Sequence, residues 1–348
     1  MQEKYLTDQT ALLDFLKILS QEFRLFTPKI KESVPNKEDD YIYYQGVDPA
    51  GFRFNPYRVI DPVKTFFTPA VEKAAAYFNV QDSPGVPVKV ALFGVKSCDL
   101  HALIFQDYVF LEGLAEDALY RQRRENTLIV SSDCADFKEV CFCLAMGVKP
   151  YPEKGFDLNL SVLNDGYIVS IGSSKGEEII NKHRHLFVSA KDSQLDGLRQ
   201  KRENLCSRLN ERLRSLNIPA YDSLQRLMHQ GHDAETWKNF MRTCVECGGC
   251  NFICSTCHCF LLADRKDPSG ELNKEKSWDA CQYAAFSRVA GGANPLKTRA
   301  QRLRNRFLKK FDFFVTHMKM PACCGCGRCI EVCPGKIDIR EVLKDLAL

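Results

Sequence analysis

Two groups of cysteines near the C-terminal end of the chain have the spacing of iron–sulfur ligands. Each reads C-x2-C-x2-C-x3-C, the first running from Cys244 to Cys254 and the second from Cys323 to Cys333. Bacterial ferredoxins use this spacing to hold cubane [4Fe–4S] clusters. Three thiolates spaced two residues apart on a short loop can bind three irons of one cube, whereas the fourth cysteine points away and usually ligates the partner cluster. The sequence therefore predicts two [4Fe–4S] clusters that exchange electrons.

The fourth cysteine of each motif decides how the eight thiols divide between the clusters. Pro334 follows Cys333, as in ferredoxins. After Cys254 the next residue is Ser255 instead, which leaves Cys257 as an alternative crossing ligand. The predicted ligands are Cys244, Cys247, Cys250 and Cys333 for the first cluster, and Cys323, Cys326, Cys329 and Cys254 for the second. Gly248, Gly249, Gly325 and Gly327 are expected to let the backbone lie against the sulfides.

Zinc and disulfide chemistry fit these cysteines less well. Structural zinc sites use C-x2-C pairs that close a tetrahedron of four sulfurs, not a triple repeat. Cysteine contributes 17 of the 348 residues, a smaller share than the roughly 8–10% that marks small secreted disulfide scaffolds. A chain of this length can also bury its own core without crosslinks.

Seven basic residues between Lys297 and Lys310 support an alternative function, a zinc-dependent nucleic-acid-binding protein. Such a stripe can neutralise phosphates. Cubanes with four thiolates are anionic, however, and nearby cations offset the cost of burying them. We therefore expect the stripe to face the clusters or a partner subunit, with a plain solvated face as the simplest alternative, and we expect no nucleic-acid partner.

Four further cysteines lie in the N-terminal half. Cys98 and Cys134 each follow an expected strand, and Cys141 and Cys143 form a C-x-C pair. Adjacent strand ends in an α/β fold could bring all four together as ligands of a third cluster, although free cysteines are also common as small core residues. Nearer the first motif, Cys257, Cys259 and Cys281 are expected to pack in the core rather than to act as a ligand reserve.

The first half of the chain has the pattern of an α/β domain. Apolar, β-branched runs at 88–95 and 127–131 predict buried strands, with a helix over 99–111 between them. Asn164-Asp165-Gly166 predicts a hairpin turn. A helical stripe of apolar residues over 10–23 predicts a packing helix. The fold class is therefore α+β or α/β at the N-terminus, followed by a mostly α-helical, ferredoxin-like dicluster domain.

Three regions follow from this pattern. Residues 1–190 form the α/β domain, 191–235 a helical connector, and 236–348 the dicluster domain, with helices expected at 279–289 and 297–311. No G-x-G-x-x-G after a strand and no G-x-x-x-x-G-K-[ST] occurs, so no nucleotide site is expected. No catalytic constellation stands out either, and we expect no catalytic residues.

Composition and charge place limits on location. The net charge of +4 is mild and does not by itself imply nucleic acid. No signal peptide and no apolar run of membrane-spanning length is seen. The thiols should therefore stay reduced in a cytoplasm, without a membrane span.

Several stretches in combination resemble a known family. They are Cys244–Cys259, Trp278–Gln282, Val289–Gly292, Arg304–Arg306 and Cys323–Pro334, with Phe93–Asp99, Arg123–Arg124 and Cys141–Cys143 upstream. Together they are similar to the iron–sulfur β subunit of cytoplasmic NAD(P)-linked [NiFe] sulfhydrogenases and to the corresponding iron–sulfur subunit of anaerobic sulfite reductases. Members of that family have C-P-T-C-x-C where this chain has Cys254-Ser255-Thr256-Cys257-His258-Cys259.

The resemblance implies a subunit that passes electrons between two partners. One partner is a flavin subunit that binds NAD(P)H, and the other is a catalytic or small iron–sulfur subunit of a hydrogenase, sulfite reductase or heterodisulfide reductase type of complex. It further implies that Cys98, Cys134, Cys141 and Cys143 act together, as ligands of a third [4Fe–4S] cluster.

Overall fold

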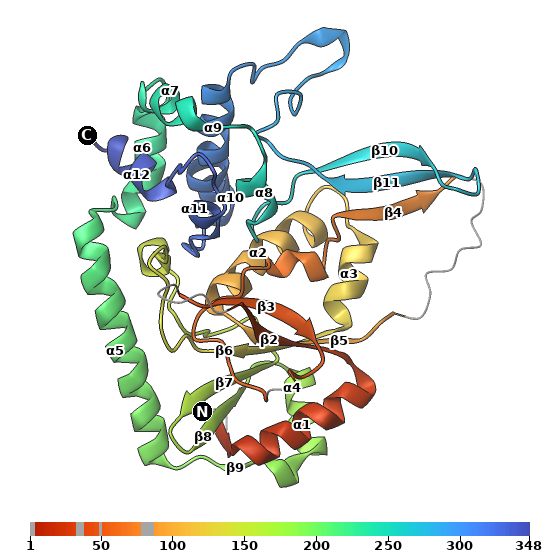
Figure 1. Cartoon of the computed structure of the whole chain (residues 1–348), viewed down its shortest axis with the longest axis vertical. Coiled ribbons are helices and arrows are strands. Elements are labelled where there is room, and N and C mark those ends of the chain that lie inside the picture. Colours follow the sequence, from red (N-terminus) through yellow and green to blue (C-terminus); the bar gives the residue numbers. More distant parts are fainter. Residues whose placement is uncertain (1–3, 33–37, 49–50, 78–86) are drawn as a thin grey trace.

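An eight-stranded mixed sheet forms the base of the molecule (Figure 1). The computed structural model describes residues 4–32, 38–48, 51–77 and 87–348. The strand order is β3-β2-β5-β6-β7-β8-β1-β9, with parallel pairing from β2 through β7 and antiparallel pairing outside it. The strands are β1 Lys4–Thr7, β2 Arg24–Glu32, β3 Asp40–Gln45, β5 Val90–Val95, β6 Thr127–Ser132, β7 Leu158–Leu163, β8 Gly166–Ile171 and β9 Val188–Ser189.

The central strands are buried on both faces, as their apolar runs predict. Side chains alternate along β5, so that Phe93 enters the core beneath the sheet while Leu92 enters the core above it. The lower core is covered by α1 (Gln9–Glu22) and α4 (Ser174–Lys182), and the upper core by α2 (Ser97–Leu111) and α3 (Ala118–Glu125). The predicted strands, hairpin and α/β architecture of this half are confirmed.

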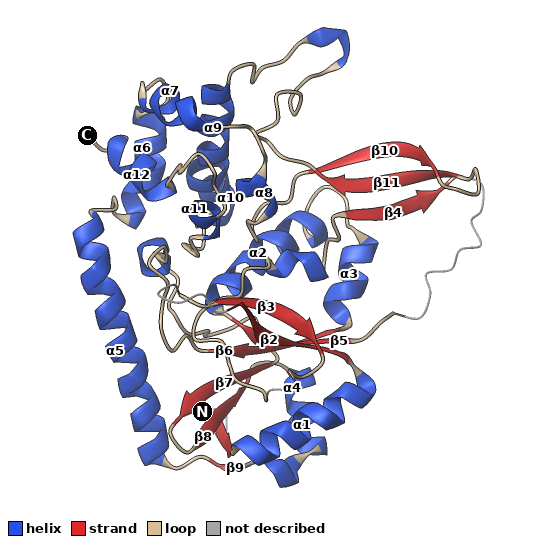
Figure 2. Ribbon diagram, in the orientation of Figure 1, coloured by secondary structure: helices blue, strands red, loops and turns tan. Residues whose placement is uncertain are grey.

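A second, three-stranded sheet joins distant parts of the chain (Figure 2). It pairs β4 (Val71–Ala76) with β11 (Leu272–Trp278), which in turn pairs with β10 (Phe260–Lys266). The expectation of a mostly helical dicluster domain is therefore not confirmed, because a hairpin occupies part of it. The helix expected at 279–289 is also wrong, since that segment consists of turns. The partner strand β4 lies about 200 residues away in sequence, so local periodicity could not reveal it.

Helices build the rest of the molecule around their own apolar core. The long helix α5 (Asp192–Leu216) runs along one side of the molecule and leads from the base to this upper part (Figure 1). The expected helix at 297–311 is present as α9 (Arg299–Leu308), which continues into a π-helical turn, η7 (Lys309–Phe313). The remaining helices are α6 Leu224–Gln230, α7 Thr236–Phe240, α8 Gly249–Phe252, α10 Phe314–Met318, α11 Arg328–Glu331 and α12 Ile339–Asp345, with short 3-10 turns between.

The two halves are fastened by a buried ion pair. Arg328 in the second cysteine motif donates two hydrogen bonds of 2.7 Å to Asp99 in α2, and both side chains are 1% exposed. Ser255, just after the first motif, donates to the same carboxylate at 2.8 Å. Both cysteine motifs are thereby positioned against the N-terminal sheet. Within the described residues, no helix combines the length and apolarity needed to span a bilayer.

Candidate iron–sulfur sites

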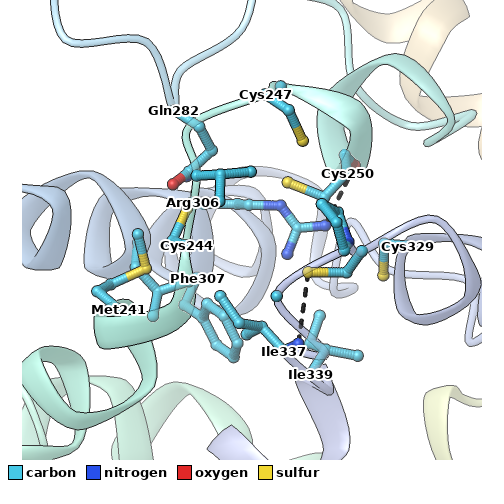
Figure 3. Close-up of a pocket in the computed structure, with 16 residues that line it drawn as sticks. Met241, Cys244, Cys247, Cys250, Gln282, Arg306, Phe307, Cys329, Ile337 and Ile339 are labelled. Carbon is cyan, nitrogen blue, oxygen red and sulfur yellow. Dashed lines mark hydrogen bonds between the residues drawn. The ribbon is translucent and has the colours of Figure 1, made fainter.

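The first set of predicted thiols surrounds one cavity (Figure 3). Two backbone N–H groups are directed at its sulfurs, because Glu246 N lies 3.4 Å from Cys244 Sγ and Ile337 N lies 3.4 Å from Cys333 Sγ. Such N–H···S contacts stabilise thiolate ligands. We call Cys244, Cys247, Cys250 and Cys333 the first thiol set.

The rest of the lining of this cavity is mainly apolar, with one positively charged side chain, Arg306. Leu303, Phe307 and Ile339 line the cavity beside the thiols. Arg306 extends from α9 toward Cys250 and donates to its carbonyl at 3.4 Å (Figure 3). Burial raises the pKa of Cys250 to about 12. In the absence of a bound metal group this thiol is therefore neutral at neutral pH.

The second set of predicted thiols lies directly beside the first, with Cys254, Cys323 and Cys326 buried and Cys329 half-buried. Burial raises the pKa of Cys323 to about 12, and the nearby Cys329 and Cys254 add to that rise. Lys310 Nζ lies 3.4 Å from Cys254 Sγ. Cys329 also lines the cavity of the first set, so the two sets adjoin. We call Cys254, Cys323, Cys326 and Cys329 the second thiol set.

Both candidates for the crossing ligand lie at the edge of the second set. Cys254 lies close enough to Cys323 and Cys329 to raise the pKa of both, after the larger effect of burial. Cys257, which contacts Cys254, lines a neighbouring cavity with Cys259 and Cys281. Cys254 remains the predicted fourth member of the second set.

The four N-terminal cysteines also come together around one cavity. Cys98 lies in the first turn of α2 and Cys134 follows β6, so both are at the carboxyl ends of neighbouring parallel strands. Cys141 lies in the loop before η2 (Cys143–Met146), and Cys143 is the first residue of η2. Cys326 of the second set lines the same cavity. We call Cys98, Cys134, Cys141 and Cys143 the N-terminal thiol set.

Two glycines explain how the second motif reaches this loop. Gly325 and Gly327 have φ angles of +63° and +73°. A Cβ on Gly325 would lie 2.5 Å from the Cα of Cys143, and one on Gly327 would lie 2.4 Å from the Val140 carbonyl. Phe142 N donates to the Gly325 carbonyl at 2.8 Å. The absence of a side chain at these two glycines makes room for another stretch of backbone.

Three of the seven basic residues before the second motif are buried. Arg302, Arg306 and Lys310 recur every four residues along α9 and η7, and each is at most 5% exposed. They are therefore unable to form an open surface for phosphates. Arg306 and Lys310 lie beside thiols, whereas Arg302 pairs with Glu246 and bonds to backbone carbonyls. The buried part of the segment does not support the nucleic-acid alternative.

The donor atoms around the cavities fit anionic iron–sulfur groups. In the described ranges, no three His, Cys, Asp or Glu side chains converge closely enough to hold a single metal ion. The thiols instead line the walls of cavities, with buried cations next to them. Positive charge of this kind offsets the cost of burying thiolates and sulfides.

Comparison with known proteins agrees with this geometry. A family model described as a 4Fe-4S dicluster domain matches residues 243–337, a range that includes both cysteine motifs. The β subunit of sulfhydrogenase 2 from Pyrococcus furiosus is 32% identical over 293 residues, which is 83% of this chain and 84% of that protein. The chain belongs to the sulfhydrogenase β-subunit family. Family membership and the dicluster match together support an iron–sulfur electron-transfer subunit.

Motif spacing did not reveal several polar side chains that lie beside the thiols in this chain. Lys64 donates to the carbonyls of Asn251 and Cys257 at 3.1 Å each, although it lies in the N-terminal half. Asn251 donates to Cys281 Sγ at 3.1 Å. The four-residue spacing of Arg306 and Lys310 was a usable signal, because basic residues on one helical face point in one direction. Lys64 carried no such signal.

Proposed function

We propose that the chain relays electrons, one at a time, between a flavin subunit that binds NAD(P)H and a catalytic or small iron–sulfur subunit of an anaerobic cytoplasmic oxidoreductase. A [4Fe–4S] cluster supplies a one-electron redox couple to the thiols that hold it. In this proposal the first and second thiol sets each hold one. The relative's printed name, subunit beta of a sulfhydrogenase, supports a place in a multi-subunit complex.

The adjacency of the two thiol sets is the observation that carries the proposal. Cys329 belongs to the second set but lines the cavity of the first, and it lies close enough to Cys250 of the first set to add to the rise in the pKa of that thiol. Clusters held by these two adjoining thiol sets would be close enough to exchange electrons through the protein interior. A catalytic site would need convergent acid, base or substrate-binding groups, and these cavities offer mostly thiols, cations and apolar side chains.

Exposure suggests where a partner approaches. Cys247 is exposed, whereas Cys254, Cys323 and Cys326 of the second set are buried. A redox partner that docks over the first motif would therefore come nearest to the first set. The second set, deeper in the molecule, would connect it with the N-terminal thiol set.

The N-terminal thiol set is proposed to hold a third [4Fe–4S] cluster. Its four thiols share one cavity, and Cys326 of the second set lines that cavity as well. Two buried cations, Arg58 and Lys96, lie beside it, and Arg58 Nε donates to the Cys326 carbonyl at 2.8 Å. Like the cavities of the first and second thiol sets, this cavity combines cysteine thiols with neighbouring buried cations.

Removing one motif thiol tests the central proposal. The Cys247→Ser and Cys326→Ser variants, purified anaerobically, are each expected to lose about four irons per chain and one paramagnetic signal of the reduced protein. Cys206→Ser is the matched control, because Cys206 lies on α5 and outside both motifs. Unchanged iron in either motif variant, or zinc in place of iron in the native chain, would contradict the proposal.

The N-terminal set is tested separately by Cys98→Ser. We expect this variant to lose about four irons while the signals assigned to the two motifs remain. Iron that stays at the wild-type level in folded Cys98→Ser protein would leave these cysteines as core residues. Co-purification of the native complex, followed by identification of its flavin and catalytic subunits, tests the proposed partners.

A further inference from the structure

A further cavity beside the two motifs collects three cysteines that neither thiol set uses. Cys257 and Cys259 lie between α8 and β10, and Cys281 follows β11, so the β10–β11 hairpin brings them together. We call these three residues the thiol triad. Burial raises the pKa of Cys259, and Cys281 is 2% exposed.

One buried amide connects the triad with the first thiol set. Asn251 is 2% exposed, and its Nδ2 donates to Cys281 Sγ at 3.1 Å and toward Cys257 Sγ at 3.7 Å. The Cys250 thiol lies 3.7 Å from the Oδ1 of the same side chain. Two triad sulfurs are therefore oriented by a donor, which is how proteins position sulfur ligands of a metal group.

The cavity is surrounded by cations without carboxylate partners. Lys309 Nζ lies 3.8 Å from Cys259 Sγ, and Lys64 donates to the Cys257 carbonyl at 3.1 Å and lies over the Trp278 ring. Lys310 lines the cavity and bonds to Thr256 and to Cys254. Among the described residues, no carboxylate forms an ion pair with Lys64, Arg306, Lys309 or Lys310. Burial of several unpaired positive charges is costly unless an anion lies beside them.

An unsatisfied donor gives an independent indication of an anionic occupant. Arg306 is 5% exposed and lines both this cavity and that of the first thiol set. Its Nε is buried and has no hydrogen-bond partner. An orphaned charged donor between two thiol-lined cavities indicates that an acceptor occupies the space next to it.

We propose that the thiol triad binds an iron–sulfur cluster of its own, beyond those held by the two motifs and by the N-terminal thiol set. His258 lines the same cavity, and its Nδ1 faces the Thr256 carbonyl at 3.2 Å, which leaves Nε2 available. The triad and His258 together offer four ligand atoms, the number that a cubane takes. The inference rests on the proposed electron-transfer function and adds a binding site to it.

Two thiol replacements test the triad. In the full chain purified anaerobically, Cys259→Ser and Cys281→Ser are each expected to lose about three to four irons, matching sulfide, and one paramagnetic component of the reduced protein. The signals that disappear in Cys247→Ser and Cys326→Ser should persist in both. Cys206→Ser again serves as the control.

The results separate this inference from the proposed function. If the motif variants lose iron while folded Cys259→Ser and Cys281→Ser keep the wild-type content, the triad proposal is wrong and the relay stands. Zinc bound at one equivalent and lost in Cys281→Ser would also overturn it. If no variant changes the iron content, both proposals fail.

A charge variant covers the case in which the thiol variants do not fold. Lys309→Gln keeps every thiol, and we expect unchanged iron with a lower midpoint potential for one paramagnetic component, because a cation beside its sulfur is removed. Potentials that remain those of the wild type for every component would contradict a cluster in this cavity.

Discussion

Single charged side chains set the electrostatic environment of these thiols. Arg306 is buried between the first thiol set and the triad, and Lys310 lies between the second set and the triad. Burial lowers the pKa of Lys310, but the neighbouring thiols raise it by more, so this lysine stays charged at neutral pH. Fixed positive charge next to an anionic group favours its more reduced state, because the added electron is attracted to it.

Replacing Arg306 should therefore change the midpoint potential of a cluster and leave the iron content of the protein unchanged. Arg306→Met is expected to lower the midpoint potential of the signal that Cys247→Ser removes, with iron content unchanged. Redox titration followed by paramagnetic resonance measures this. Arg304→Met is the matched control, because Arg304 lies on the same helix and bonds to the His232 carbonyl and Asp233 away from the thiols. Equal potentials in the two variants would show that Arg306 does not act on the first set.

Two elements contact the cysteine-rich segments, one through lysine side chains and the other through its backbone. The π-helical turn η7 widens the end of α9, and both Lys309 and Lys310 reach sulfurs from it, at Cys259 and Cys254. Consecutive side chains of a regular α-helix point about 100° apart. The wider π turn brings the directions of Lys309 and Lys310 closer together, so both can reach sulfurs on the same side. On the other side, the loop of the second motif lies against residues 140–143.

That loop contact predicts a strong effect of a single methyl group. Gly327→Ala adds a Cβ where the Val140 carbonyl lies 2.4 Å away, at a φ of +73°. We expect about 2–5 kcal/mol of destabilisation from clash and backbone strain, and weaker retention of iron by the second and N-terminal sets. Thermal unfolding under anaerobic conditions and iron analysis check both effects.

Gly270→Ala is the control for backbone strain alone. Gly270 has a φ of +90° in the β10–β11 turn, with open space where a Cβ would be placed. The Gly270→Ala variant should lose only about 1–2 kcal/mol of stability and no iron. Equal costs at Gly270 and Gly327 would mean that the loop contact contributes little.

At the scale of the whole molecule, the Asp99–Arg328 pair connects the N-terminal sheet with the second motif. Arg328 also donates to the Val59 carbonyl at 2.8 Å, so it bridges two parts of the N-terminal half. Because both partners are buried, loss of one leaves the other charged and unpaired. The pair therefore makes the positions of the N-terminal and second thiol sets interdependent.

A double-mutant cycle tests this connection. Arg328→Met alone should cost about 3–5 kcal/mol in apparent stability, because Asp99 remains buried without its partner. The combined Asp99→Asn, Arg328→Met variant should cost less than the sum of the single changes. Denaturant unfolding followed by visible absorbance measures each variant. Simple additivity would show that the two side chains are not energetically coupled.

The sequence alone determined the parts of this protein that depend on local spacing. The triplets Cys244–Cys250 and Cys323–Cys329 lie on short loops, so their thiols are close in any fold that forms those loops. Apolar runs and the Asn164–Gly166 turn likewise predicted the central strands and the hairpin, because pleating and turn chemistry act over a few residues.

Only the tertiary structure decided what depends on distant contacts. Lys64 meets Cys257 across 193 positions, and Asp99 meets Arg328 across 229. The pairing of β4 with β11, the gathering of the N-terminal set and the cavity of the triad depend on contacts of the same kind. No local periodicity encodes them, because each depends on how separately formed elements pack together and bury their charges.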